Sequence, residues 1–100
     1  MIVSVRTFDL KEDKYFEGIR WAQSMTKLFS DEFGVQVKIL TAVSGPTQQI
    51  HFVSEYDSLA DFEELMSKML AHPKVQEFSK QRAEFSVEGT SEHNIYRSLE

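Results

Sequence analysis

Two stretches of alternating apolar and polar residues, separated by a short turn signal, most strongly limit the folds open to this chain. Residues 35–43 place a β-branched residue at every second position, and residues 49–56 alternate in a similar way. Side chains along a strand point to opposite faces in turn, so each run predicts a strand with a more apolar face. Because Ser44, Gly45 and Pro46 favour a turn between the runs, the two strands are predicted to form a hairpin.

A strand and a long helix are predicted ahead of the hairpin. Residues 2–8 are rich in β-branched residues, which is typical of a strand. Asp9 and Glu12 have the spacing of a capping box, which predicts that a helix begins beside them. Apolar residues then recur at helical spacing to about Phe33, and Gly34 suits the left-handed conformation that ends many helices.

A second helix is predicted after the hairpin, with a break at its end. Ser58 and Asp61 have capping-box spacing, and an apolar stripe runs from Leu59 to Leu70. Pro73 disfavours helical geometry at the preceding residue and suits the first turn of a new helical segment. We therefore expect a second, shorter helical segment to begin at Pro73.

The last part of the chain completes a recognisable order of elements. Residues 85–87 predict the start of a last strand, and residues 95–99 either resume it or form a separate extended tail. The resulting order, β-α-β-β-α-β, is the ferredoxin-like arrangement of an α+β fold. Connection rules predict a four-stranded antiparallel sheet in the order 4-1-3-2 with the helices on one face. A length of 100 residues favours a single domain over residues 1–100.

The sheet face that the helices leave open is predicted to be mixed in polarity. If the more apolar side of each strand meets the helices, Arg6 and Phe8 lie on the open face. A face exposed to water is usually mostly polar, so we expect a second copy to cover it, with the two sheets enclosing a space lined by Arg6, Lys38, His51 and Glu55. The alternative is a monomer with scattered exposed apolar residues. The residues predicted to face outward are Ser4, Arg6, Phe8, Gln36, Lys38, Leu40, Ala42, Gln49, His51, Val53 and Glu55.

Composition and motifs narrow the function classes. The net charge of −5 disfavours nonspecific nucleic-acid binding, and the absence of cysteine excludes disulfides and thiolate chemistry. No metal-ligand spacing, phosphate-binding loop, dinucleotide fingerprint or nucleophile elbow occurs, so we expect neither a metal site nor a cofactor. The N-terminal residues lack the pattern of a signal peptide and no apolar run is long enough to span a bilayer, so a soluble cytoplasmic protein without membrane contact is expected.

One stretch of sequence also carries a resemblance to a known family. Residues 52–62, a strand ending in an acid and an aromatic residue that runs into a Ser-Leu-Ala helix start, and the later Leu70-Ala71-His72-Pro73, resemble NIPSNAP-type and antibiotic-biosynthesis-monooxygenase-type members of the dimeric α/β-barrel superfamily. The resemblance implies a ferredoxin-like protomer that pairs into a barrel, often with a small-molecule pocket. Haem-degrading relatives carry an Asn on the first strand, which is absent here, so no haem site is expected.

Candidate site residues follow from the predicted open face. His51 and Glu55 are the best acid–base pair, since side chains four residues apart on a strand point the same way. Arg6 on the neighbouring strand is expected to reach one of them, and Lys38 adds positive charge. The structural alternative is that these groups only form a salt bridge and hydrogen bonds. The predicted ligand-binding residues are Arg6, Lys38, Phe8, Trp21 and His72, with packing and helix termination as the structural alternatives for Trp21 and His72; His93 is expected to be exposed.

Three functional hypotheses remain open from the sequence. The first is a homodimeric barrel of unassigned activity that binds a small organic ligand, anionic or aromatic, in a pocket on the open sheet face. The second is a cofactor-independent monooxygenase or isomerase acting on an aromatic or polyketide-like substrate. The third is a protein-interaction module that uses the acidic helix surfaces and binds no small ligand.

Overall fold

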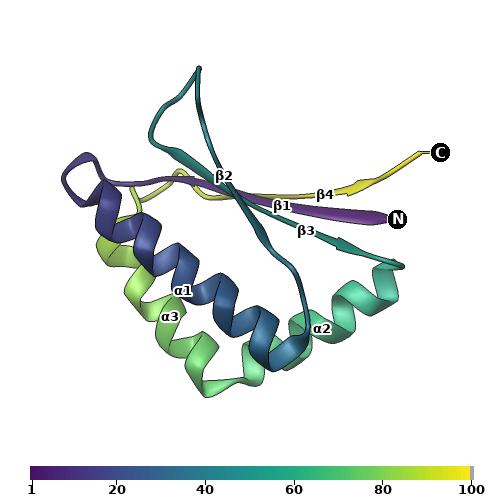
Figure 1. Cartoon of the computed structure of the whole chain (residues 1–100). Helices are drawn as coiled ribbons and strands as arrows, with labels where there is room; N and C mark the ends of the chain where they lie inside the picture. Colours follow the sequence, from purple (N-terminus) through teal and green to yellow (C-terminus); the bar gives the residue numbers. More distant parts are fainter. Residues whose placement is uncertain (100) are drawn as a thin grey trace.

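The computed structural model describes residues 1–99 as one sheet with helices packed against one side of it (Figure 1). The elements are strand β1 (Ile2–Asp9), the short 3-10 helix η1 (Glu12–Lys14), helix α1 (Tyr15–Phe33), strands β2 (Lys38–Thr41) and β3 (Gln49–Tyr56), helices α2 (Leu59–Ala71) and α3 (Pro73–Phe85), and strand β4 (Glu92–Arg97). This confirms the predicted ferredoxin-like α+β fold.

The sheet has the predicted order, β2-β3-β1-β4, and every neighbouring pair is antiparallel. Strand β1 is central, because it pairs with β3 on one edge and with β4 on the other. The register sets Arg6 opposite Phe52 of β3 and opposite His93 of β4. Directly paired residues share a face of the sheet, so these three side chains lie on the same side.

The predicted signals at the helix ends are largely confirmed. Ser58 is the N-cap of α2, and its Oγ accepts a hydrogen bond from the backbone N–H of Asp61 at 3.1 Å. Gly34 ends α1 in the left-handed conformation with φ of 66°, where a side chain would be strained. Pro73 is the first residue of α3, as its missing N–H allows.

The predicted start of the first helix is wrong. Asp9 belongs to β1 and does not cap a helix, because its backbone N–H donates to Thr90 Oγ1 and its carbonyl accepts from the Val87 N–H. Helix α1 begins later, at Tyr15, after the turn of η1 and without a side-chain cap.

Two strand predictions also change. Strand β2 covers only Lys38–Thr41 of the alternating run 35–43. Phe85 ends helix α3, and Ser86 after it makes only an isolated β-bridge with Leu10, so residues 85–87 do not begin the last strand. The last strand is instead β4, which uses residues 92–97 at the sheet edge and is exposed throughout.

The largest correction concerns which way β1 faces. Phe8 is buried and Arg6 half-buried on the helix-covered side, together with Ser4, whereas all three were predicted on the open face. The open face instead carries Val3 and Val5, with Thr7 beside them. The prediction failed because both faces of this central strand carry apolar residues, so choosing the valine side as the inner side followed a pattern that does not discriminate.

Two apolar clusters hold the helices on the sheet. The larger joins β1, β3 and α1 through Phe8, Trp21, Ile50 and Phe52, with Leu10 completely buried beneath Gly18 of α1. The smaller joins α1 to α3 and consists of Leu28, Phe29 and Val75. None of the helices within residues 1–99 is long and apolar enough to cross a membrane.

Candidate functional site

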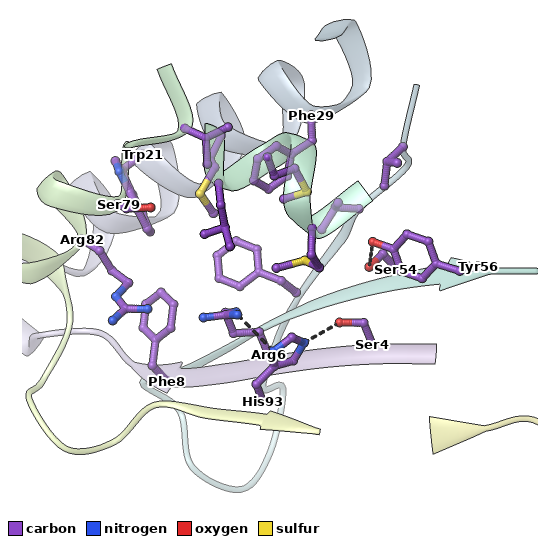
Figure 2. Close-up of a pocket in the computed structure, with 18 residues that line it drawn as sticks. Ser4, Arg6, Phe8, Trp21, Phe29, Ser54, Tyr56, Ser79, Arg82 and His93 are labelled. Atoms are coloured by element: carbon purple, nitrogen blue, oxygen red, sulfur yellow. Dashed lines mark hydrogen bonds between the residues drawn. The ribbon is translucent and has the colours of Figure 1, made fainter. Parts of the chain in front are cut away.

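A cavity of about 170 Å³ lies between the sheet and all three helices, between the two apolar clusters (Figure 2). Its floor comes from β1 and β3, and its roof from α1, α2 and α3. The polar side chains that line it are Ser4, Arg6, Ser54, Tyr56, Ser79, Arg82 and His93. Asp and Glu are absent from this lining within the described part of the chain.

A hydrogen-bonded chain of three side chains forms one wall of the cavity. Arg6 Nη2 lies 3.0 Å from His93 Nδ1, and His93 Nε2 lies 2.8 Å from Ser4 Oγ (Figure 2). A guanidinium can only donate, so Nδ1 of His93 must accept from Arg6. The neutral imidazole then carries its proton on Nε2 and donates it to Ser4, which fixes the tautomer.

Two arginines approach the cavity from opposite layers. Arg6 comes from β1, and Arg82 comes from α3 with its guanidinium carbon 5.8 Å from the centre of the Phe8 ring. Burial lowers the pKa of Arg6, and the positive charge of Arg82 lowers that pKa further. Within residues 1–99 no carboxylate oxygen lies within 4.0 Å of either guanidinium. Positive charge therefore accumulates at this end of the cavity without an internal counterion.

Trp21 also lines the cavity, and its indole carries a buried donor. Its side chain is buried, with 7% of the residue exposed, and its Nε1–H has no hydrogen-bond partner within residues 1–99. A buried donor without a partner costs roughly 1–3 kcal/mol, so such groups usually have a reason to persist. The aromatic rings of Phe8 and Phe85 hold the indole in place, at centroid distances of 6.2 and 5.8 Å.

The rest of the cavity wall is apolar and partly flexible. Methionines 25, 66 and 69 line it with Phe29 and Val75, and methionine side chains adapt easily to the shape of a ligand. At the far end, Ser54 Oγ and Tyr56 Oη lie 3.0 Å apart. The cavity thus has a cationic end and an apolar body, with a small neutral polar pair beyond it.

Arg82 also borders a second hollow. A second, more polar hollow of about 580 Å³ lies beside the α3–β4 connection, and Lys11 and Ser86 are among the residues that line it. Ser79 and Arg82 line both hollows. Arg82 therefore lies between the cavity and this second hollow.

The structure divides the predicted site residues between the two faces of the sheet. Arg6, Phe8 and Trp21 come together in the cavity, although the sequence placed the pocket on the other side. His51 and Lys38 lie on the open face, where His51 Nδ1 is 2.7 Å from Thr7 Oγ1.

Glu55 of the predicted acid–base pair is exposed on that same open face. The expectation that Arg6 reaches Glu55 or His51 is wrong, because the strand pleat sends Arg6 to the opposite side of the sheet.

His72 has a structural position at the junction of α2 and α3. Its Nδ1 accepts a hydrogen bond from the Lys74 N–H at 3.1 Å, and its Nε2 lies 3.6 Å from a carboxylate oxygen of Glu32. Its ring packs edge-on against Phe33. This residue is absent from the cavity lining within residues 1–99, so the structure gives it the helix-terminus position that was its structural alternative.

Two cavity residues were missed by the sequence reasoning. Arg82 follows Val75 and Phe78 at spacings of seven and four residues, which puts it on the inward face of α3, and this periodicity could have revealed it. His93 was expected to be exposed in an irregular segment. It remains accessible, yet its ring reaches inward because β4 begins at Glu92, earlier than the predicted residues 95–99.

Metal binding finds no support in the arrangement of potential ligands. Among residues 1–99, no group of three or more His, Asp or Glu side chains is placed to hold an ion. The histidines at 51, 72 and 93 lie on the open face, at a helix junction and at the cavity edge.

Comparisons with known proteins find the same architecture in solved structures. A family model described as NIPSNAP matches residues 3–100. A NIPSNAP domain protein from Burkholderia xenovorans superposes with a TM-score of 0.83 at 18% identity, over 99% of this chain and 95% of that one. A NIPSNAP family protein from Agrobacterium tumefaciens gives 0.83 at 20% identity, over 98% of this chain and 85% of that one.

A Nitrosomonas europaea protein, provisionally named an antibiotic biosynthesis monooxygenase, gives a TM-score of 0.77 at 18% identity over the whole of both chains. A search of curated proteins finds no match.

Proposed function

The chain belongs to the NIPSNAP family, and we propose that it binds a small apolar organic anion, of the carboxylate type, in the cavity between sheet and helices. The observation that supports this most directly is the convergence of Arg6 and Arg82 on a cavity without a lining carboxylate in the described residues. The proposal keeps the anionic ligand expected from the sequence and moves its site to the helix-covered face.

Charge and hydrogen bonding favour an anion over a neutral ligand. The two arginines and the Ser4 hydroxyl, whose proton is free once Ser4 accepts from His93, are all donors. An acceptor-rich group such as a carboxylate matches this set and neutralises positive charge that is otherwise unpaired. Charge-assisted hydrogen bonds of this kind contribute roughly 1.5–3 kcal/mol each.

The apolar body of the cavity defines the rest of the ligand. Phe29, Val75 and the methionines offer a surface for an aryl group or a short alkyl chain, with the carboxylate turned towards Arg6 and Arg82. Benzoate and octanoate are simple representatives of these two ligand shapes.

The test uses the only tryptophan as its reporter. Trp21 gives the single indole N–H signal in a ¹⁵N–¹H correlation spectrum, so titration with benzoate or octanoate should shift one isolated resonance. We expect dissociation constants of roughly 10 μM to 1 mM, confirmed by calorimetry. Benzamide, the neutral counterpart of benzoate, should bind at least about tenfold more weakly. If neither acid moves the indole signal at millimolar concentration, or if benzamide binds as well as benzoate, the proposal is wrong.

We also propose that a second copy of the chain covers the open sheet face. This face carries Val3 and Val5 of β1, with Val53 opposite Val5 and Tyr96 opposite Val3. Leu40 and Tyr96 on this face are 49% and 53% exposed. Exposed apolar residues gathered on one face are typical of an interface, and two-fold pairing is the commonest assembly of soluble proteins. In such a pair, His51, Lys38 and Glu55 lie between the two sheets.

Catalysis, the second functional hypothesis from the sequence, stays a prediction. The neighbours named after antibiotic biosynthesis monooxygenases are below 25% identity, and a shared fold does not imply a shared reaction. The predicted acid–base pair, His51 and Glu55, lies across the sheet from the cavity. We therefore propose ligand binding. The cavity offers no specific support for catalysis at this pair or for the protein-interaction module, and both stay hypotheses.

A further inference from the structure

The contact between Arg6 and His93 occupies two groups that an anion would need. Arg6 Nη2 donates to the ring nitrogen Nδ1 of His93, and this lone pair is the basic site of the imidazole (Figure 2). The other nitrogen is already protonated and donates to Ser4. Protonation of Nδ1 would place an N–H against a guanidinium N–H, so this contact holds His93 in its neutral form.

An anion in the cavity changes the partners of Arg6. A carboxylate offers charge-assisted hydrogen bonds in the paired geometry that suits guanidinium, which a neutral imidazole nitrogen cannot match. The Arg6 donor is then directed to the ligand, and the lone pair of His93 loses its partner. At the same time the ligand brings a negative charge close to the ring.

We propose that His93 is the proton-accepting partner of the anion site: when an anion engages Arg6, His93 takes up a proton on Nδ1, so the ligand binds together with a proton. This inference rests on the proposed function. No bond other than N–H is made, and the proton comes from the solvent. The protonated ring then offers a second cationic donor to the ligand, while Nε2–H keeps Ser4 in position.

The surroundings of His93 agree with this proposal in the direction in which they shift its pKa. Burial lowers the pKa of His93 below its usual value of 6.5, and the positive charge of Arg6 lowers it further. From β1 the ring faces Arg6 and Ser4, and from α2 it faces the ring of Phe62 at 5.9 Å. Arg82 of α3 and Tyr56 of β3 line the same cavity. An anion that neutralises Arg6 removes the opposing charge and raises this pKa, so proton uptake is expected at and below neutral pH.

The experiment counts protons during binding. Benzoate is titrated into the whole protein by calorimetry at about pH 6, in two buffers of different ionisation enthalpy, such as MES and bis-Tris. Benzoate is fully ionised there because aromatic carboxyls titrate about two pH units lower. We expect an uptake of at least about 0.3 proton per benzoate for the unaltered protein. His93→Gln, which retains amide groups for Arg6 and Ser4 but does not titrate, should bind benzoate without proton uptake.

A matched histidine on the other face separates a local effect from a general one. His51→Gln removes an imidazole that contacts Thr7 across the sheet, and it should leave the uptake unchanged. Benzoate binding with uptake below about 0.1 proton, or uptake that survives His93→Gln, overturns the inference and leaves the proposed function intact. If neither benzoate nor octanoate binds, the proposed function itself is wrong, and the inference with it; if only octanoate binds, the same proton count is made with octanoate.

Discussion

Arg6 Nη2 lies 3.0 Å from Nδ1 of His93, although the two residues are 87 positions apart in the chain. Their strands are neighbours because β4 returns along the free edge of β1, in a register that sets Arg6 opposite His93. The contact joins a cation to a ring that must remain neutral to accept from it. The first and last strands thereby bring together the polar wall of the cavity.

Removal of the Arg6 charge should weaken anion binding. We expect Arg6→Gln to raise the dissociation constant for benzoate by about tenfold or more, since at least one charge-assisted hydrogen bond is lost. Calorimetry on the variant measures this. Lys38→Gln removes a positive charge from the open face and should leave affinity within about twofold. Equal losses in the two variants would mean that only the overall charge matters.

The unpaired indole should matter more for binding than for folding. Trp21→Phe removes the Nε1–H that lacks a partner, and this gain offsets part of the loss of apolar contact. We expect the free energy of unfolding to fall by less than about 1.5 kcal/mol in urea titrations, while calorimetry shows a threefold to tenfold weaker benzoate affinity, by about 0.6–1.4 kcal/mol. Unchanged affinity would remove Trp21 from the ligand contacts.

A charge in the centre of the open face should separate the two copies. Val5 lies on the middle strand of this face, paired with Val53, so Val5→Lys buries a lysine in the proposed interface. Light scattering at micromolar concentration should give twice the chain mass of 11.6 kDa for the unaltered protein and the single mass for the variant. Val43→Lys, in the fully exposed hairpin loop, is the control that should stay dimeric. A monomeric unaltered protein would refute the dimer.

Stability should depend on pH through His93. Its pKa is lowered in the folded state by burial and by Arg6, so the unfolded chain binds the proton more readily than the folded one. The stabilising contribution is therefore complete above the unfolded pKa near 6.5 and declines as pH falls below it. Thermal melting between about pH 7.5 and 5.5 should show a smaller loss of Tm for His93→Gln than for the unaltered protein. His51→Gln serves as the comparison, and identical pH profiles for all three proteins would contradict the assignment.

The cap of α2 offers a test of the fold itself. Ser58→Ala removes the oxygen that accepts from the Asp61 N–H and should lower the free energy of unfolding by about 1 kcal/mol. Ser67→Ala, on the same helix, removes a hydroxyl that only bonds back to the Glu63 carbonyl and should be neutral or slightly stabilising. Urea titrations of both variants decide this, and a Ser58→Ala protein as stable as Ser67→Ala would show that the cap contributes nothing.

Local sequence patterns predicted most of the fold but little of the candidate site. The alternation around Ser44–Pro46, the cap at Ser58 and the break at Pro73 are short-range features, so their consequences follow from nearby residues alone. The start of α1 was misplaced because Asp9 satisfies its backbone with Val87 and Thr90, which are some eighty residues away. A local sequence pattern does not reveal that these distant residues take up the backbone hydrogen bonds of Asp9.

The sequence by itself determined the order of elements and the order of strands in the sheet. It also identified Arg6, Phe8 and Trp21 as candidate ligand-binding residues. Only the tertiary structure decided that Arg6, Phe8 and Trp21 meet on the helix-covered face, beside Arg82 and His93, and that His51 and Glu55 lie on the other. The reason is that β1 is apolar on both sides, so its periodicity fixes which residues share a face and leaves the choice of face to packing. Packing makes that choice: Phe52 is buried in the core beneath the helices, and Arg6, which lies opposite it in the sheet, therefore shares the helix-covered face.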